Sequence, residues 1–449
     1  MAGRFNRARL EYIWAIVQKG PTELGYAYFR ARRRRHNLPD DEPLLNESDQ
    51  LAMSGAFDLD DKTLAKNAAL IRAYRGSDSF EIRTVQWFLP YFHHAYFGGT
   101  YTLLRFADHF ARVHGVENRF HCYDVGLDSV PRMARKANEA FPSLSQARFT
   151  SAADGLDSLP PADAAIATLW SSAYPVLHFD KVRAKFFFVQ DFEPQFYPAG
   201  AGWALVEETY RFGFPGMVNT PGLCDLYRSY GNPAVSFVPA VDRHRYHPPS
   251  EPRDPDAPVR VFFYARTKTP RNAFGLGVTA LAKLKDTYGD RVEVVCAGEN
   301  WNPAQFGLAG RITNLGVLGS LEEVAAVYRS CDIGLVFMLT KHPSYQPFEF
   351  MASGMATVSN INESTTWLLR DGENCLLTPP LATPTAERLG RLVEDVELRQ
   401  RIATAGLRTV EQYRWEEQIE RVWEAMTLKD RAFAVEADQK IEVGGRHAG

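Results

Sequence analysis

The sequence predicts an α/β protein made of two facing, doubly wound parallel-sheet domains with a ligand-binding crevice between them. First, the chain has 449 residues, more than the roughly 250–300 residues at which a single hydrophobic core stops growing. Second, from about residue 82 onward, short β-branched or aromatic runs alternate with longer stretches of helical periodicity. Third, a proline-rich segment at 247–258 interrupts this alternation, which then begins again. Two βαβ domains in tandem are therefore expected.

The N-terminal domain is predicted to span residues 81–245, after a basic arm and lead-in helices in residues 1–80. Its central strand is Phe186–Gln190, because this run is apolar on both faces of the sheet. The other predicted strands are 85–89, 119–123, 165–169, 217–219 and 236–238, and the predicted helices are 101–113, 129–140, 203–212 and 223–229.

The C-terminal domain is predicted to span residues 246–410. Ser320 and Glu323 have the spacing of a capping box, so a helix is expected to follow them. The predicted strands are 259–264, 292–297, 312–315, 333–338, 356–359 and 375–377, and the predicted helices are 273–288, 321–329 and 348–353. An amphipathic helix in 411–430 presents one apolar stripe, which comprises Trp415, Ile419, Val422, Trp423 and Met426. Residues 431–449 are polar and end in glycine, so a flexible tail is expected.

The composition is that of an ordinary globular protein, with 45% hydrophobic and 23% charged residues. The five cysteines are scattered, so neither a zinc knuckle nor a disulfide framework is indicated, and a reducing compartment is favoured. The sequence has no apolar run long enough to span a bilayer and no pattern typical of a secretory signal. We therefore expect a soluble, cytoplasmic protein.

The net charge of −3 conceals a basic N-terminal arm. Residues 1–36 contain nine Lys or Arg and two Glu, and apolar residues recur in this arm at helical spacing. One interpretation is a helix that packs on the body of the protein. The other is a peripheral contact with an anionic membrane, with Tyr12 and Trp14 at the interface. The arginine run at 32–35 lacks interleaved aromatic residues, so no nucleic-acid partner is expected.

The loop after strand 259–264 carries the first candidate chemistry. Arg266, Lys268 and Arg271 follow one another closely, directly before a predicted helix. Two guanidinium groups at the carboxyl end of a parallel strand can bind one diphosphate, and the start of the helix adds amide donors. The alternative is a solvated basic loop.

The loop TKHPSYQPFEF carries the second candidate chemistry. His342, Ser344 and Tyr345 offer polar groups at the expected crevice. Pro347 suits the first turn of a helix, and Glu349 falls in that turn, where its carboxylate can accept hydrogen bonds from sugar hydroxyls. The alternative for Glu349 is a carboxylate that only complements the helix dipole.

Two segments of the N-terminal domain complete the candidate set. Gly98 and Gly99 precede a helix and would let a ligand approach the backbone closely. Asp191 and Glu193 follow the central strand. The aromatic residues of the same loop are Phe192, Phe196 and Tyr197. Rings stack on sugar faces and carboxylates bind hydroxyls, so this loop suits a carbohydrate; the alternative is a turn structured by its two prolines.

Other motifs do not indicate a cofactor. Gly275 and Gly277 match part of a dinucleotide fingerprint, but they lie inside a predicted helix rather than in a tight strand-helix turn. The acidic pair at 58–60 is interpreted as a helix cap and the pair at 254–256 as part of the linker. Neither a metal-ligand motif nor a Gly-Lys-Thr phosphate loop is found, so no metal or other cofactor is expected.

The ordered set of motifs resembles the retaining glycosyltransferases of family 4, which have the GT-B fold of two Rossmann-like domains. FVPAVDRHRYHP resembles the family's interdomain element, and ARTKTPRN places Arg266 and Arg271 where the family has Arg and Lys. VVCAGE and YRWEEQIERVW match later landmarks in order. The resemblance covers roughly residues 84–426 and is nearest to bacterial rhamnosyltransferases of surface-polysaccharide assembly.

The resemblance implies metal-independent transfer of a hexose, such as rhamnose, from a dTDP-, UDP- or GDP-sugar to a glycan or lipid-linked glycan, with retention. It implies that Arg266 and Arg271 neutralise the leaving diphosphate, that Glu349 binds the ribose, and that Asp191 orients the acceptor or the sugar. The remaining donor-side residues are Gly98, Gly99, Glu299, Lys341, His342, Ser344 and Tyr345, and those on the acceptor side are Asp191, Glu193 and Tyr197. Lys341 stands where the family has its first glutamate, which leaves the donor sugar open.

Two other functions are compatible with these motifs. A GT-B epimerase or phosphorylase would use the same sugar nucleotides or sugar phosphates, but an epimerase forms no glycosidic bond and needs no acceptor. An inactive, glycan-binding partner of a transferase is the second alternative, because Lys341 replaces an expected glutamate. The missing dinucleotide fingerprint weighs against an oxidoreductase.

Overall fold

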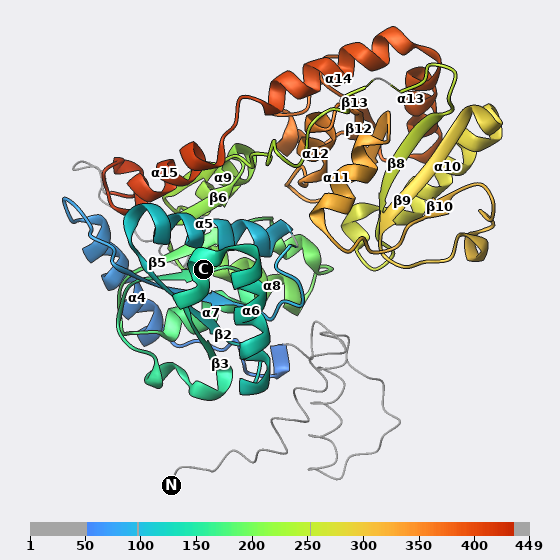
Figure 1. Cartoon of the computed structure of the whole chain (residues 1–449). Coiled ribbons are helices and arrows are strands. Elements are labelled where there is room, and N and C mark those ends of the chain that lie inside the picture. Colours follow the sequence, from blue (N-terminus) through green and yellow to red (C-terminus); the bar gives the residue numbers. More distant parts are fainter. Residues whose placement is uncertain (1–51, 97, 252, 435–449) are drawn as a thin grey trace, which may run out of the picture.

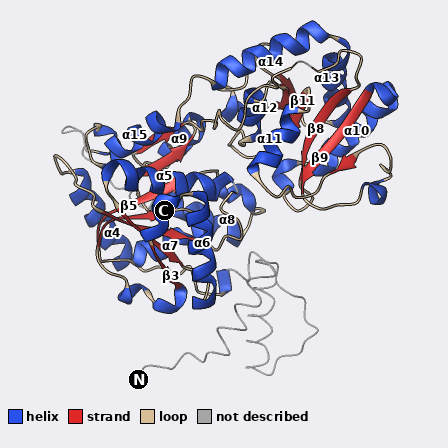
Figure 2. Cartoon of the chain, in the orientation of Figure 1, coloured by secondary structure: helices blue, strands red, loops and turns tan. Residues whose placement is uncertain are grey.

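The computed structural model describes residues 52–434, except 97 and 252, and contains two parallel β-sheets (Figure 1). Helices cover both faces of each sheet, so the strands form the middle layer of each domain (Figure 2). The predicted two-domain α/β fold is confirmed. The basic arm at residues 1–36 lies outside the described residues. Within the described part, no helix is both long and apolar enough to cross a membrane.

The N-terminal domain is built on a seven-stranded sheet with the order β3-β2-β1-β4-β5-β6-β7. Its strands are β1 (Thr84–Leu89), β2 (Glu117–Cys122), β3 (Arg148–Ser151), β4 (Ala162–Ala167), β5 (Val182–Val189), β6 (Gly216–Asn219) and β7 (Ala234–Phe237). Its helices are α4 (Asp61–Arg75), α5 (Gly98–His114), α6 (Val130–Ala140), α7 (Trp170–His178), α8 (Ala201–Glu208) and α9 (Pro221–Arg228). Helices α5 and α6 pack on one face of the sheet, and α7, α8 and α9 pack on the other.

The sequence pattern does not predict β3 or α7. Strand β3 is a short edge strand that begins at the exposed Arg148, so it lacks the apolar run that marks a buried strand. Helix α7 contains Pro175, which removes a backbone donor and lowers the helical signal. The predicted helix 203–212 ends as an α-helix at Glu208 and continues as a 3₁₀ turn.

The C-terminal domain is built on a six-stranded sheet with the order β10-β9-β8-β11-β12-β13. Its strands are β8 (Val259–Ala265), β9 (Val292–Gly298), β10 (Thr313–Asn314), β11 (Ile333–Val336), β12 (Ala356–Asn360) and β13 (Leu376–Thr378). Its helices are α10 (Phe274–Tyr288), α11 (Leu321–Arg329), α12 (Gln346–Ala352), α13 (Ala382–Glu394) and α14 (Val396–Val410). Helices α13 and α14 are not predicted, and each contains a glycine, which weakens helical propensity.

Only one of the two hydrogen bonds of the predicted capping box is present at the start of α11. Ser320 is the N-cap, and its hydroxyl accepts a hydrogen bond from the backbone N–H of Glu323. The Glu323 carboxylate, however, accepts from the N–H of Gly319 at 2.7 Å, not from that of Ser320. The cap is therefore present without the reciprocal bond of a capping box.

The chain returns to the N-terminal domain at its C-terminal end. Helix α15 (Trp415–Met426) lies against the N-terminal sheet, and the whole predicted apolar stripe is buried there. The predicted start of the flexible tail, residue 431, is too early, because Phe433 is fully buried and packs against Phe186. Residues after 434 lie outside the described part.

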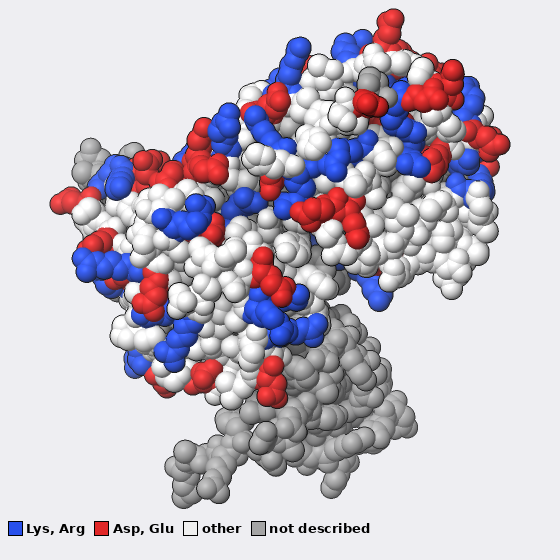
Figure 3. Space-filling view, in the orientation of Figure 1, with Lys and Arg blue, Asp and Glu red and all other residues white. Residues whose placement is uncertain are grey.

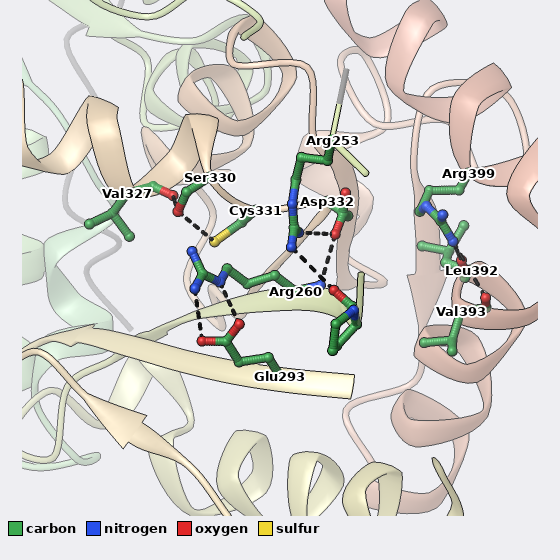
Figure 4. A network of polar contacts seen from close by, with 11 residues as sticks. Arg253, Arg260, Glu293, Val327, Ser330, Cys331, Asp332, Leu392, Val393 and Arg399 are labelled. Atoms are coloured by element: carbon green, nitrogen blue, oxygen red, sulfur yellow. Dashed lines mark hydrogen bonds and ion pairs between the residues drawn. The ribbon is translucent and has the colours of Figure 1, made fainter. Parts of the chain in front are cut away.

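Ion pairs connect neighbouring strands of the C-terminal sheet at the amino-terminal ends of the strands (Figure 4). The Arg260 guanidinium donates two hydrogen bonds to Glu293, at 2.8 and 2.9 Å, and joins β8 to β9. Asp332, just before β11, accepts from the backbone N–H of Arg260 and pairs with Arg253. These contacts are at the opposite end of the strands from the crevice, so we interpret them as structural.

Figure 3 shows that cationic and anionic side chains are interspersed over the described residues on the face drawn.

Candidate active site

A cleft of about 700 Å³ lies between the two domains, at the carboxyl ends of the central strands of both sheets. This is where open parallel sheets bind ligands, and the volume suits a small-molecule substrate. Residues of the N-terminal domain at the cleft include Gly98, Gly99, Thr102, Arg105, Gln190, Asp191 and Glu193. Those of the C-terminal domain include Arg266, Arg271, His342, Ser344, Tyr345 and Glu349.

Arg271 connects the two walls of the cleft. It lies in the turn between β8 and α10, and its Nε is 4.0 Å from the Asp191 carboxylate. Its guanidinium also lies over the ring of Phe196, 4.5 Å from the centroid. Both partners belong to the N-terminal domain. The Nε atom is buried and has no hydrogen-bond partner among the described residues, so Arg271 can still donate to a bound anion.

Glu299 organises the basic loop, although we expected it to bind the donor. Its carboxylate accepts hydrogen bonds from the N–H groups of Thr267 and Lys268, at 2.9 and 3.1 Å. The other carboxylate oxygen is 3.7 Å from Nε of Arg266. Glu299 and Lys268 are not among the cleft-lining residues, whereas Arg266 is. Glu299 therefore acts on the cleft by positioning Arg266.

His342 is a buried, neutral imidazole at the cleft. Its Nδ1 accepts a hydrogen bond from the backbone N–H of Ser344 at 2.9 Å, which places the ring proton on Nε2. Nε2 has no partner among the described residues. Burial, and then the nearby Arg271, lowers the pKa of His342 to about 3. The side chain can therefore donate one hydrogen bond to a ligand oxygen without carrying charge. Lys341, beside it, does not line the cleft.

Tyr345 crosses from the C-terminal domain into the N-terminal domain. Ser344 has a left-handed backbone conformation (φ 70°) directly before it. The Tyr345 hydroxyl is 2.7 Å from Oγ1 of Thr102 and accepts a hydrogen bond from Asn219 at 2.9 Å. Its ring lies so close to Gly98 that a Cβ there would come within 2.9 Å of it. Gly98 thus makes room for Tyr345, whereas the sequence suggested that it makes room for a ligand.

Glu349 lies in the first turn of α12, as predicted, and lines the cleft. Burial raises the pKa of its carboxyl group to about 7, against the opposing effect of hydrogen bonds from the hydroxyls of Tyr246 and Tyr328. The two tyrosines come from the interdomain segment and from α11. The carboxyl group is therefore held by neighbouring side chains, which a helix-dipole role alone would not require.

Asp191 is a buried carboxylate at the junction of the domains. It accepts hydrogen bonds from the hydroxyl of Thr340 at 3.0 Å and from the backbone N–H of Phe192 at 2.8 Å. Burial raises the pKa of Asp191 to about 6, although Thr340 and Arg271 both lower it. Because Thr340 and Arg271 belong to the facing domain, Asp191 helps to hold the two walls together.

Glu193, which lines the cleft, and Tyr197 both contact the first residue of α7. The Glu193 carboxyl group accepts a hydrogen bond at 2.6 Å from the N–H of Trp170, the first residue of α7. Burial raises the pKa of Glu193 to about 8. The Tyr197 ring packs edge-on against Trp170, and Tyr197 does not line the cleft. Both residues therefore support the start of α7.

Arg105 is a cleft residue that no sequence motif indicated. Its guanidinium lies among the rings of Tyr101, Trp415 and Phe141, at 5.0, 5.1 and 5.7 Å from their centroids. Its Nε is buried without a hydrogen-bond partner in the described residues, and burial lowers the pKa of Arg105. The only local signal is an arginine on the otherwise apolar face of α5, four residues after Tyr101.

Comparison with known proteins identifies relatives of both the sequence and the fold. Residues 259–390 match the family described as the C-terminal domain of WsaF. The O-antigen biosynthesis protein RfbC of Myxococcus xanthus is 42% identical over 366 residues, which are 79% of this chain and 28% of that protein. A phosphatidyl-myo-inositol mannosyltransferase of Mycobacterium tuberculosis is 29% identical over 37% of this chain and 47% of the relative. The chain thus spans less than half the length of these curated relatives.

Solved structures show the fold. HepE from Anabaena, solved with UDP and glucose, superposes with a TM-score of 0.59 at 12% identity, over 77% of this chain and 99% of that one. Sucrose-phosphate synthase from Thermosynechococcus elongatus gives the same TM-score over 76% of this chain and 98% of the other. The two facing sheets and these neighbours identify the fold as GT-B.

Proposed function

We propose that this chain is a glycosyltransferase that moves a hexosyl group from a nucleotide-diphosphate sugar to a glycan or lipid-linked glycan acceptor, with retention. The observation that carries the proposal is the position of Arg271 between the two walls of the cleft. A diphosphate bound there would lie where donor and acceptor domains meet. The relation to RfbC supports a role in O-antigen or related polysaccharide assembly.

The chemistry required is departure of a diphosphate from a carbon that becomes oxocarbenium-like. Negative charge grows on the leaving group, so cations positioned there stabilise the transition state more than the ground state. Arg266 and Arg271 supply that charge, and the Nε2–H of His342 adds a neutral donor. In this mechanism the two arginines replace the cation that a metal ion would otherwise supply.

Asp191 has a positioning role in this proposal, not that of a nucleophile. Its carboxylate is already engaged by Thr340, the Phe192 amide and Arg271, whereas a double-displacement glycosidase keeps a free carboxylate beside the anomeric carbon. Retention then requires attack from the face that the diphosphate leaves, with a phosphate oxygen accepting the proton of the acceptor hydroxyl. The Glu349 carboxyl group is proposed to bind the ribose.

The donor can be identified by a thermal-unfolding panel of dTDP-, UDP- and GDP-sugars, followed by a product assay with a glycan acceptor. A donor at 100 times its dissociation constant should stabilise the protein by about 2.7 kcal/mol. UDP-glucose belongs in the panel because UDP and glucose are bound in the HepE neighbour. Stabilisation together with a new glycosidic bond supports the proposal. Conversion of the donor without an acceptor indicates an epimerase, and binding without any turnover indicates an inactive partner.

The close approach of the two domains provides a further prediction. Gly222, at the start of α9, faces the C-terminal domain, and a Cβ at this position would be 2.3 Å from the carbonyl oxygen of Ser364. Because a backbone atom cannot rotate away, Gly222→Ala must shift the start of α9 or the segment around Ser364 and so alter the contact between the domains. We expect kcat/KM to fall by about tenfold to a hundredfold, since misplacement of about 1 Å can cost that much.

The matched control for this prediction is Gly275→Ala. Gly275 lies in the first turn of α10, and nothing lies within 4 Å of the position of its Cβ. This variant should retain wild-type activity. Equal activity of Gly222→Ala and wild type would show that the domain approach seen here is not required for transfer.

The basic arm at residues 1–36 is proposed to bind anionic membrane surfaces, where a lipid-linked acceptor would be found. Each basic side chain near such a surface contributes about 1 kcal/mol, and the attraction decays over about 8–10 Å. The full chain should therefore sediment with phosphatidylserine vesicles, less so at high salt, and a variant lacking residues 1–36 should not. Equal sedimentation of both would exclude the arm, and unfolding of the shortened chain would favour a packing role.

A further inference from the structure

His109, His114 and Glu420 form a cluster outside the cleft. His109 and His114 belong to α5, Glu420 belongs to α15, and none of the three lines the cleft. Nε2 of His109 is 2.6 Å from Oε1 of Glu420, and Nε2 of His114 is 2.9 Å from the same oxygen. In the described part of the chain, this is the only place where three potential metal-ligating atoms come together, all within 4.8 Å of one another.

The donor set fits a Zn²⁺ ion held by three protein ligands and one water. Two imidazole nitrogens and one carboxylate oxygen are a common ligand set for Zn²⁺, which lies about 2.0–2.2 Å from such atoms and takes four ligands in a tetrahedron. The His109 side chain is 5% exposed and that of His114 is 17% exposed, so both rings are held by the protein. The Glu420 side chain is 37% exposed, so it can shift to admit an ion and leaves a path for a water ligand.

Neighbouring residues hold the two imidazoles in place. The His114 ring stacks on Trp423 of α15 with centroids 4.1 Å apart and an angle of 11°. The rings of His109 and His114 are 5.9 Å apart. His114 is the last residue of α5, where the helix ends and lets its side chain approach that of His109. The Glu420 carboxylate, within 3 Å of Nε2 of both rings, supplies negative charge to the cluster.

We propose that His109, His114 and Glu420 form a structural Zn²⁺ site that fastens α15 to α5. Helix α15 is the segment by which the chain returns from the C-terminal domain, so an ion there joins the end of the chain to the N-terminal domain. The ion binds Nε2 of each neutral imidazole, so the proton that otherwise lies between Nε2 and Glu420 moves to Nδ1 of the same ring. Its role is stabilisation, because the cluster contains none of the proposed catalytic residues.

The test uses the full chain without a polyhistidine tag, freed of metal with a chelator and then titrated with ZnCl₂. We expect one zinc ion per chain and a rise of about 2 °C or more in the apparent midpoint of thermal unfolding at saturation. Tryptophan fluorescence should change during the titration, and this change should be lost in Trp423→Phe. Failure of the wild-type protein to bind zinc at 100 times the protein concentration would overturn the proposal and leave a hydrogen-bonded cluster only.

Glu420→Gln separates a metal site from a hydrogen-bond network. The glutamine oxygen can still accept from both imidazole N–H groups, but it is a poor zinc ligand. We expect this variant and His114→Gln to keep the metal-free unfolding midpoint within a few degrees and to bind zinc at least tenfold more weakly. His178→Gln, at an exposed histidine on α7, should bind zinc as the wild type does. An equal zinc response in wild type and both cluster variants would also overturn the proposal. Activity in EDTA at moderate temperature should be unchanged, so this test is independent of the transferase assay.

Discussion

Replacing Arg271 by alanine is expected to lower kcat by about a hundredfold or more, while the dissociation constant of the nucleotide sugar changes much less. The guanidinium meets charge that grows as the diphosphate leaves, and removal of one such preorganised donor typically costs about 3 kcal/mol. The same change removes the cation beside Asp191, so the pKa of Asp191, already raised by burial to about 6, should rise further. The acidic limb of the pH-rate profile should move to higher pH accordingly.

Two further variants and one control test whether the arginines act on the leaving diphosphate. Arg271→Lys keeps the charge but loses the planar fork and the contact with Phe196, so we expect an intermediate activity. Arg266→Ala should also lower turnover more than donor binding, because Arg266 lines the same cleft. Lys268→Ala, in the same loop but outside the cleft lining, should be close to wild type. If both arginine-to-alanine variants kept activity within threefold of wild type, the two arginines would have no part in the chemistry.

Glu349→Gln is expected to make the protein more stable at alkaline pH and to impair donor binding. Burial raises the pKa of Glu349 to about 7 in the folded protein, above the value of about 4.5 of an unfolded glutamate. The folded state therefore retains a proton that the unfolded state has lost between these two pH values. The stability that Glu349 contributes is fully present below about pH 4.5 and is lost as the pH rises through about 7.

Glutamine resembles the protonated acid and does not titrate, so the free energies of unfolding of variant and wild type should agree near pH 4.5. At pH 8 the variant should be more stable by an amount on the order of 3 kcal/mol. Chemical denaturation at several pH values measures this difference. Glu387→Gln, on the exposed side of α13, is the control and should run parallel to wild type. Parallel curves for Glu349→Gln would contradict the raised pKa, and undiminished donor binding would contradict the ribose-binding role.

The sequence by itself determined the architecture and the location of the cleft. Hydrophobic periodicity depends only on residues close together in the chain, so it predicted most strands. The cap residue Ser320 likewise predicted the start of α11. Local spacing also placed Glu349 in the first turn of α12. The rule that ligands bind at the carboxyl ends of parallel strands directed attention to Arg271 and Asp191, which the structure brings to one cleft.

Only the tertiary structure decided which partner each polar side chain takes. Glu193 follows the central strand as expected, yet its carboxyl group binds the start of α7. Tyr345 belongs to the predicted donor loop, but its hydroxyl contacts Thr102, which is 243 residues away in the chain. Arg105 became a candidate only when three rings from separate segments surrounded it. Periodicity and spacing report which face of an element is buried, whereas the partner of a buried polar group depends on segments that meet only when the whole chain folds.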